Sequence, residues 1–129
     1  MKVVIIGANG QLGVDLVHVF RAKEHEVITL NHEQVSVVNM KLLEKYLKAI
    51  VPDIVINTAA MHHVETCEEK PVAAFQVNGL GALNLSTICK EIGATLVHFS
   101  TDYIFDGSKK TPYFVSTVKT IFYDIGKYN

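Results

Sequence analysis

The strongest constraint on the fold is a strand-like run that leads through a glycine-rich turn directly into a helical pattern. Lys2–Ile6 is a continuous, β-branched run, which is typical of a strand buried on both faces of a parallel sheet. Gly7–Gly13 follows with the spacing G-x-x-G-x-x-G, and Gln11–Lys23 then shows a helical period. The chain is therefore predicted to open with a strand, a tight turn and a helix that packs back on that strand.

The glycine turn, in this context, predicts a site for phosphate groups. Gly7 permits the tight turn, Gly10 lets a pyrophosphate approach the backbone, and Gly13 lets the helix lie close to the strand. The helix N-terminus adds backbone N–H groups and a partial positive charge. The predicted dinucleotide-binding residues of this turn are Gly7, Asn9, Gly10, Gln11, Leu12 and Gly13. The alternative is a helix-start turn without a ligand.

Strand-like and helical patterns alternate along the rest of the chain. The predicted strands are Lys2–Ile6, Glu26–Leu30, Ile54–Asn57 and Thr95–Ser100, and the predicted helices are Gln11–Lys23, Met40–Ile50 and Val72–Ile92. This order predicts an α/β fold, a Rossmann-type doubly wound parallel sheet, with the strand order 3-2-1-4. The side chains predicted to face the sheet are Leu12, Leu16, Val19 and Phe20 in the first helix and Leu43, Tyr46, Leu47 and Ile50 in the second. Gly79 and Gly81 fall inside the third helix, where close packing would make them tolerable.

Composition narrows the class of protein. The 129 residues are 49% hydrophobic and 19% charged, with a formal net charge of −1, which is a globular balance without the basic surface of a nucleic-acid-binding protein. The longest apolar runs are of strand length, and the chain begins directly with one, so we expect neither a membrane span nor a signal peptide. Cys67 and Cys89 are read as reduced thiols of a cytoplasmic protein.

The form of the cofactor stays open at this stage. In NAD-binding folds the second strand usually ends in an acidic residue that binds the ribose diol. Here Leu30 is followed by Asn31, His32 and Glu33, with no Asp at the expected place and no Arg for a 2′-phosphate. Asn31 is a candidate cofactor-binding residue for either form, so the cofactor is NADP or NAD.

Three longer strings resemble the dTDP-4-dehydrorhamnose reductases, which are extended short-chain dehydrogenases of the nucleotide-sugar type. Pro52–Ala60 reads P-D-I-V-I-N-T-A-A, and Ala74–Leu85 reads A-x-x-V-N-x-x-G-x-x-N-L. Ser100–Gly107 reads S-T-D-Y-I-F-D-G, the most specific string in the chain. The resemblance covers the first 113 residues.

The resemblance implies roles for particular residues. Ala59 and Ala60 would let the backbone run close to the cofactor, and Asn78 would brace the active-site backbone. Thr101 would contact the substrate carbonyl, and Ser100, a candidate cofactor-binding residue, would shape the same pocket; the alternative is an ordinary strand end with exposed hydroxyls. His62 and His63 are interpreted as loop residues and not as metal ligands, because no third ligand stands at a familiar zinc spacing.

The resemblance stops after Tyr113, so we expect an NAD(P)-binding Rossmann domain over 1–113 and a divergent tail over 114–129. Tyr123 and Lys127 in that tail have the Y-x-x-x-K spacing of the family's catalytic pair, in which the Lys lowers the Tyr pKa and the Tyr protonates the carbonyl oxygen. Chance and a genuine pair are both open explanations. Reductases of the family are more than twice as long, so the resemblance implies a truncated member that lacks the substrate domain.

Three functions remain open. The first is NAD(P)-dependent reduction of a nucleotide-linked 4-keto-6-deoxysugar by descent, with catalytic residues Thr101, Tyr123 and Lys127 and with little activity expected of the isolated chain. The second is a non-catalytic NAD(P)-binding or regulatory module, like the β-subunit of methionine adenosyltransferase. The third is a folded remnant without a ligand. Uncovered apolar surface also predicts a homodimer or larger assembly.

Overall fold

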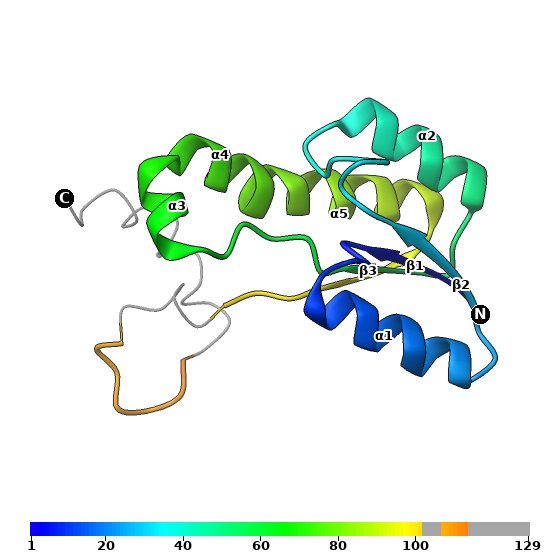
Figure 1. Cartoon of the computed structure of the whole chain (residues 1–129), viewed down its shortest axis with the longest axis horizontal. Coiled ribbons are helices and arrows are strands. Elements are labelled where there is room, and N and C mark those ends of the chain that lie inside the picture. Colours follow the sequence, from blue (N-terminus) through cyan, green and yellow to red (C-terminus); the bar gives the residue numbers. More distant parts are fainter. Residues whose placement is uncertain (102–106, 114–129) are drawn as a thin grey trace. The chain divides into compact units, whose positions relative to one another are not determined.

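The computed structural model describes residues 1–101 and 107–113 of the chain, and the fold lies in one compact unit, Met1–Phe99. Strands and helices alternate along this unit (Figure 1). The strands are β1 (Lys2–Ile6), β2 (Glu26–Leu30), β3 (Ile54–Asn57) and β4 (Thr95–His98). The helices are α1 (Gln11–Ala22), α2 (Met40–Ile50), α3 (Val64–Glu69), α4 (Pro71–Phe75), the π-helical turn η1 (Gln76–Leu80) and α5 (Gly81–Ile92). The second unit, Ser100–Asn129, has no helix or strand among its described residues.

The four strands form one parallel sheet in the order β2-β1-β3-β4. The prediction of a parallel α/β sheet is confirmed, but the predicted order 3-2-1-4 is wrong. The third strand pairs with β1 on the side opposite β2, with Val3 beside Ile54 and Ile6 beside Asn57. A local pattern of alternating strands and helices shows that crossovers exist and does not show to which side of β1 each one goes. The crossover to β2 therefore runs to one side of β1 and the next crossover, to β3, runs to the other side. Ligands of such sheets bind at the carboxyl ends of the two strands where the order switches, here β1 and β3.

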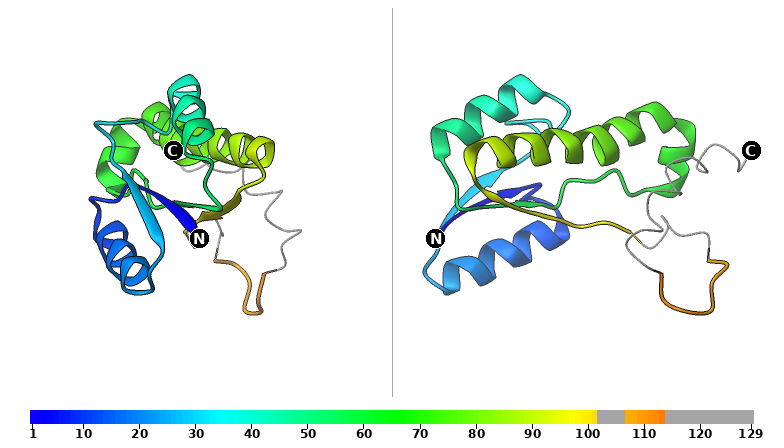
Figure 2. Two further views of the ribbon diagram at one scale, coloured as in Figure 1. Left: turned by 90° about the vertical axis from the view of Figure 1, so that its right-hand side faces the viewer. Right: turned by 180° about the vertical axis from the view of Figure 1, so that it is seen from behind.

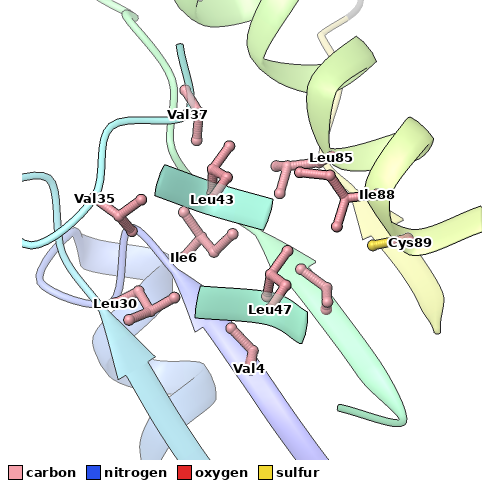
Figure 3. Close-up of a cluster of buried hydrophobic side chains, with 11 residues drawn as sticks. Val4, Ile6, Leu30, Val35, Val37, Leu43, Leu47, Leu85, Ile88 and Cys89 are labelled. Carbon is pink, nitrogen blue, oxygen red and sulfur yellow. The ribbon is translucent and has the colours of Figure 1, made fainter. Parts of the chain in front are cut away.

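Helices cover the two faces of the sheet unequally (Figures 1 and 2). Within residues 1–101 and 107–113, helix α1 is the one helix on one face, while α2 and the long helix that ends in α5 lie on the other. The larger core lies under α2 and α5, where Leu43, Leu47, Leu85 and Ile88 meet Val4 and Ile6 of β1 (Figure 3). A smaller cluster under α1 contains Val3, Ile5, Val17 and Ile56. These layers place the glycine turn and the loop after β3 at the same end of the sheet.

The inward face of α1 differs from the predicted one. Leu16 and Phe20 pack against the core as expected, but Leu12 and Val19 are 41% and 51% exposed. Gly13 and Val17 are the buried residues of this helix. The close approach of Gly13 to the preceding turn rotates the helix so that positions 13, 17 and 20 face the sheet. In α2, Leu43 and Leu47 are buried as predicted, Ile50 packs at the edge of the core, and Tyr46 is exposed.

Pro71–Ile92 forms one long helical segment, which nearly matches the predicted Val72–Ile92, with Pro71 in its first turn and Gly93 at its end with a φ of 73°. A Cβ on Gly81 would lie 2.6 Å from Cγ2 of Val37, so the predicted close packing is confirmed at this glycine. The segment of 22 residues is also long and apolar enough to cross a membrane, with a mean hydropathy of 1.2. In this fold its inner side packs on the sheet through Leu85, Ile88 and Cys89.

Two local features depart from the prediction. Helix α3 was not predicted, because its six residues are too few to show a helical period. Strand β4 ends at His98 instead of Ser100, because β3 ends at Asn57, which pairs with His98 and leaves no partner for the residues beyond.

Cys67 and Cys89 are free thiols, and burial raises the pKa of Cys89.

Candidate functional site

Two of the three motif glycines are required by the fold itself. Gly7 has a φ of 78°, and a Cβ there would lie 2.8 Å from the backbone N of Ala59 and from Oγ1 of Thr58. A Cβ on Gly13 would lie 2.3 Å from the carbonyl oxygen of Gly7. The turn is closed by hydrogen bonds in which Gly7 N donates to Leu30 O at 2.9 Å and Gly10 N donates to Gly7 O at 3.0 Å. The turn is thus clamped between β2, α1 and the loop after β3.

Gly10 differs from the other two glycines because its side faces open space. A Cβ there would meet Gly7 O at 3.3 Å and no other atom within 4 Å, and its φ of −76° and ψ of 167° are ordinary extended values. The first intrahelical bond of α1 runs from Val14 N to Gly10 O, so the amides of Gln11, Leu12 and Gly13 precede it. A surface depression lined by Asn9, Gly10, Gln11, Val14 and Asp15 opens at this helix end. The chemistry of the helix end suits an anion.

The loop after β3 is tied directly to the glycine turn. The hydroxyl of Thr58 donates to the carbonyls of Ile6 and Gly7 at 2.8 and 3.1 Å, and its backbone N donates to Ile6 O at 3.0 Å. Ala59 N donates to Oδ1 of Asn57 at 3.1 Å. Ala59 is partly buried and Ala60 is exposed at the same end of the sheet. The carboxyl ends of β1 and β3 therefore form one rigid unit.

The buried side-chain amide of Asn57 links this unit to β4. Asn57 is 1% exposed, and its Nδ2 lies 3.0 Å from Nδ1 of His98. Because Oδ1 of Asn57 already accepts the Ala59 N–H, the NH₂ group faces His98 and must donate, so Nδ1 of His98 is unprotonated. Desolvation lowers the pKa of His98, which favours this neutral form. Sequence reasoning missed the pair, although a polar residue ending a buried apolar strand was a visible signal.

Asn78 braces the loop that carries Met61. Its Oδ1 accepts the N–H of Met61 at 2.8 Å, and its Nδ2 donates to the carbonyl of the same residue at 2.9 Å. The Cys67 thiol also donates to Met61 O at 3.3 Å. Asn78 therefore holds loop backbone from an exposed position, and its predicted role in bracing an active site stays a prediction. It acts from η1, so the π-helical turn positions the loop after β3.

Asn31 stands at the end of β2 beside the glycine turn. Its Oδ1 accepts the Gln34 N–H at 3.0 Å, and its own N–H donates to Oε1 of Gln34 at 2.9 Å. A depression of about 290 Å³ opens here between α1 and β2. The lining residues are Ala8, Asn9, Val14, Val17, His18, Arg21, Thr29, Asn31 and Gln34.

The predicted catalytic residues are not brought together in the described part of the chain. Ser100 and Thr101 belong to the second unit, and both are exposed. Tyr123, Lys127 and the predicted tail 114–129 lie outside the described residues. His62 and His63 are loop residues with ring centroids 4.4 Å apart, and no group of three metal-ligating side chains occurs within residues 1–101 and 107–113.

Comparisons with known proteins agree with this architecture. Residues 1–120 match the family model described as the RmlD substrate binding domain. The spore coat polysaccharide biosynthesis protein SpsK of Bacillus subtilis is 37% identical over 112 residues, which cover 87% of this chain and 40% of that protein. The dTDP-4-dehydrorhamnose reductase of Burkholderia thailandensis is 36% identical over 113 residues, which cover 88% of this chain and 38% of that protein.

Solved structures show the same relation. A dTDP-4-dehydrorhamnose reductase from Clostridium acetobutylicum superposes with a TM-score of 0.83 at 38% identity, over 88% of this chain and 40% of that one. The dTDP-4-dehydrorhamnose reductase of Bacillus anthracis, solved in complex with NADP, superposes with a TM-score of 0.80 at 33% identity, over 85% of this chain and 40% of that one. The chain thus spans about two fifths of the length of these relatives, 38% to 40%.

Proposed function

Because the chain belongs to the RmlD substrate binding domain family, we propose that it supplies the cofactor-binding half of an NAD(P)-dependent reductase of a nucleotide-linked 4-keto-6-deoxysugar. The observation that carries the proposal is the glycine turn. Neighbouring atoms occupy the space that a Cβ would need at Gly7 and at Gly13, whereas the side of Gly10 faces open space beside the amides that begin α1. If the turn had a structural role alone, residue 10 would not have to be a glycine.

The residues present fit a dinucleotide. The amides of Gln11, Leu12 and Gly13 would bind the phosphates, with Gly10 leaving room for them. Asn31 and its neighbours would hold the adenosine end, and Ala59 and Ala60 would lie along the nicotinamide half. When bound, the cofactor supplies a hydride for the sugar carbonyl carbon. The three relatives described above as reductases, and the NADP complex of one of them, support this assignment.

The roles proposed for the remaining residues follow the family resemblance. Thr101 would donate a hydrogen bond to the substrate carbonyl oxygen, and Ser100 would shape the same pocket. Tyr123 would give its proton to that oxygen as the carbon is reduced, and Lys127 would stabilise the resulting phenolate. The proton from Tyr123 and the hydride together convert the ketone to an alcohol.

The proposed setting is a cytoplasmic enzyme that binds a nucleotide sugar and self-associates. Two free thiols support a reducing compartment. Large apolar side chains are exposed along α3, α4, η1 and the first turn of α5: Val64, Val72, Phe75, Leu80 and Leu83. An apolar surface of this kind favours association with a second copy. Light scattering over a wide range of concentrations tests this, and a monomer throughout would contradict it.

Calorimetric titration of NADPH tests the proposed function. Gly10→Val places a branched side chain where the phosphates approach, so we expect at least a tenfold rise in Kd, or about 1.4 kcal/mol. The extended φ at Gly10 accepts a valine, but its Cβ would lie 3.3 Å from Gly7 O at the N-cap of α1, so we expect a folded variant with a small loss of stability, which thermal unfolding measures. Gly79→Ala in the long helix is the control and should bind NADPH normally. Equal affinity of Gly10→Val and wild type would show that Gly10 does not face the phosphates.

A further inference from the structure

We propose that His98 controls the loop after β3 through the side-chain amide of Asn57, so that protonation of His98 releases the backbone of Ala59 and weakens dinucleotide binding. This inference rests on the proposed function, in which Ala59 and Ala60 lie along the nicotinamide half of the cofactor. Ala59 N donates to Oδ1 of Asn57 at 3.1 Å, and Nδ2 of Asn57 lies 3.0 Å from Nδ1 of His98. These two hydrogen bonds form a relay from the end of β4 to the loop.

Asn57 has a single side-chain oxygen, and the direction of this atom decides the state of the relay. In the structure the oxygen accepts the Ala59 N–H, and the NH₂ group donates to the unprotonated Nδ1 of His98. A protonated imidazole carries an N–H at both ring nitrogens, so Nδ1 would then need an acceptor. If the amide turned its oxygen toward His98, its NH₂ group would meet the Ala59 N–H. A proton gained at His98 is thereby transmitted to the backbone of Ala59.

The burial of Asn57 makes the relay respond to the proton on His98. His98 is exposed at the end of β4, so its ring exchanges protons with the solvent, whereas Asn57 is 1% exposed. Among residues 1–101 and 107–113, every buried side-chain nitrogen and oxygen has a hydrogen-bond partner. If the protonated ring swung away instead, the NH₂ group of Asn57 would lose its partner, which is costly for a buried donor. Neutral His98 therefore stabilises the arrangement that holds Ala59.

The backbone of Ala59 matters for the candidate site because it lies against the glycine turn. Its N atom lies 2.8 Å from the place that a Cβ on Gly7 would take. Thr58, the preceding residue, donates its hydroxyl to the carbonyls of Ile6 and Gly7. A shift of Ala59 would therefore disturb both the loop and the turn, which are two parts of the proposed dinucleotide site.

The surroundings of β4 leave the titration to His98 itself. Strand β3 and helix α5 pack against β4, and the loop after β3 follows. The titratable side chains of these segments and of the residue before β3 are Asp53, His62, His63, Cys89, Lys90 and Glu91. In the described part of the chain none of them shifts the pKa of His98, which partial burial lowers. The relay is therefore intact above about pH 6.5 and is lost as the pH falls through the folded pKa.

Nuclear magnetic resonance of the ¹⁵N-labelled full chain without cofactor tests the relay, from about pH 7.5 to about pH 5. In wild type we expect neutral His98 to carry its proton on Nε2, and the Ala59 amide to titrate with the same midpoint as the His98 ring. In His98→Gln an amide oxygen can accept from Asn57 and does not titrate, so the Ala59 amide should no longer follow the pH.

The double variant His62→Gln, His63→Gln is the control for the histidines on the loop, and it should leave the Ala59 titration unchanged. The inference fails if the Ala59 amide of wild type does not follow the His98 ring. It fails equally if the Ala59 amide titrates in His98→Gln as it does in wild type.

Titrations with NADP⁺, which is stable in acid, test the consequence for binding. Between about pH 7.5 and about pH 5 the affinity of wild type should fall at least about threefold more than that of His98→Gln. Comparing the two proteins removes the titration of the cofactor's own phosphate. His25→Gln is the matched control, because the His25 ring lies beside Phe20 just before β2, and it should behave like wild type.

An equal loss of affinity in wild type and His98→Gln would overturn the inference and leave the proposed function standing. Absence of NADP⁺ binding by wild type at both pH values would overturn the proposed function and, with it, the claim that the relay controls binding. The titration of the Ala59 amide would still decide whether the relay itself exists.

Discussion

At the scale of single residues, each of the three positions in the turn is a glycine for a different physical reason. Gly7 and Gly13 are excluded from carrying a Cβ by neighbouring backbone, while Gly10 is excluded by nothing in the chain beyond a 3.3 Å approach to Gly7 O. The sequence motif predicted all three positions, and the structure separates the two that the fold needs from the one whose side stays open. The spacing of a motif cannot make this distinction, because it depends on what packs against each residue.

Asn78 provides a test of how the loop after β3 is held. Asn78→Ala removes two hydrogen bonds to Met61 and should cost about 0.5–1.5 kcal/mol for each bond, towards the low end because the side chain is exposed. Hydrogen exchange at the Met61 amide should accelerate. Asn84→Ala is the control, since Asn84 donates to Val37 O and does not touch this loop. Unchanged exchange at Met61 in Asn78→Ala would show that the loop is held by other contacts.

At the scale of elements, the strands and the three long helical segments could be predicted closely, because buried β-branched runs and helical periods are local patterns. The buried face of α1 could not be predicted from the spacing of apolar residues, because it is set by the contact of Gly13 with the backbone of Gly7. The π-helical turn η1 has no signal of its own in the sequence. It nevertheless carries Asn78, so an irregular turn inside a predicted helix positions part of the candidate site.

The close contact between the long helix and the loop before α2 predicts that replacing two glycines by alanine has opposite effects on stability. A methyl group on Gly81 would press into buried Val37, a cost of about 1–3 kcal/mol that outweighs a helix-propensity gain of about 1 kcal/mol. Gly79→Ala meets the exposed ring of Phe75, which can move, so that variant should be neutral or more stable. Urea unfolding measures both. The cost of Gly81→Ala should shrink in a Val37→Ala background; if it does not, Val37 is not the obstacle.

The bond between β3 and β4 predicts a pH dependence of stability. Burial lowers the pKa of His98 below its ordinary value near 6.5, so the unfolded chain binds a proton more readily than the folded one. The contribution of neutral His98 is therefore complete above about pH 6.5 and is lost as the pH falls through the folded pKa. Protonation of Nδ1 would also set a donor against the Asn57 NH₂ group.

Urea unfolding at a series of pH values from 7 to 5 measures this dependence. In His98→Gln an amide oxygen can accept from Asn57 and does not titrate, so the free energy of unfolding should fall less steeply with acid than in wild type. An identical slope in the two proteins would show that His98 does not contribute to the acid sensitivity.

At the scale of the whole molecule, the sequence predicted a parallel α/β unit and the place of the glycine turn within it. It failed on the strand order, because the side of β1 to which a crossover runs depends on packing between elements far apart in the chain. The catalytic roles of Thr101, Tyr123 and Lys127 stay predictions, as does the expectation that these 129 residues alone have little reductase activity. The relatives are longer, and positioning of a substrate by parts of the kind they add can lower a barrier by about 7–11 kcal/mol.

The central claim is that the end of the sheet formed by the glycine turn, Asn31 and the loop after β3 holds a dinucleotide. Nuclear magnetic resonance of the ¹⁵N-labelled chain, titrated with NADPH, tests it most directly because each backbone amide reports separately. We predict saturable shifts that are largest over Gly7–Gly13, at Asn31, and at Ala59 and Ala60. Absence of saturable shifts, or shifts confined to α3 and α4 at the far end of the long helix, would contradict the account.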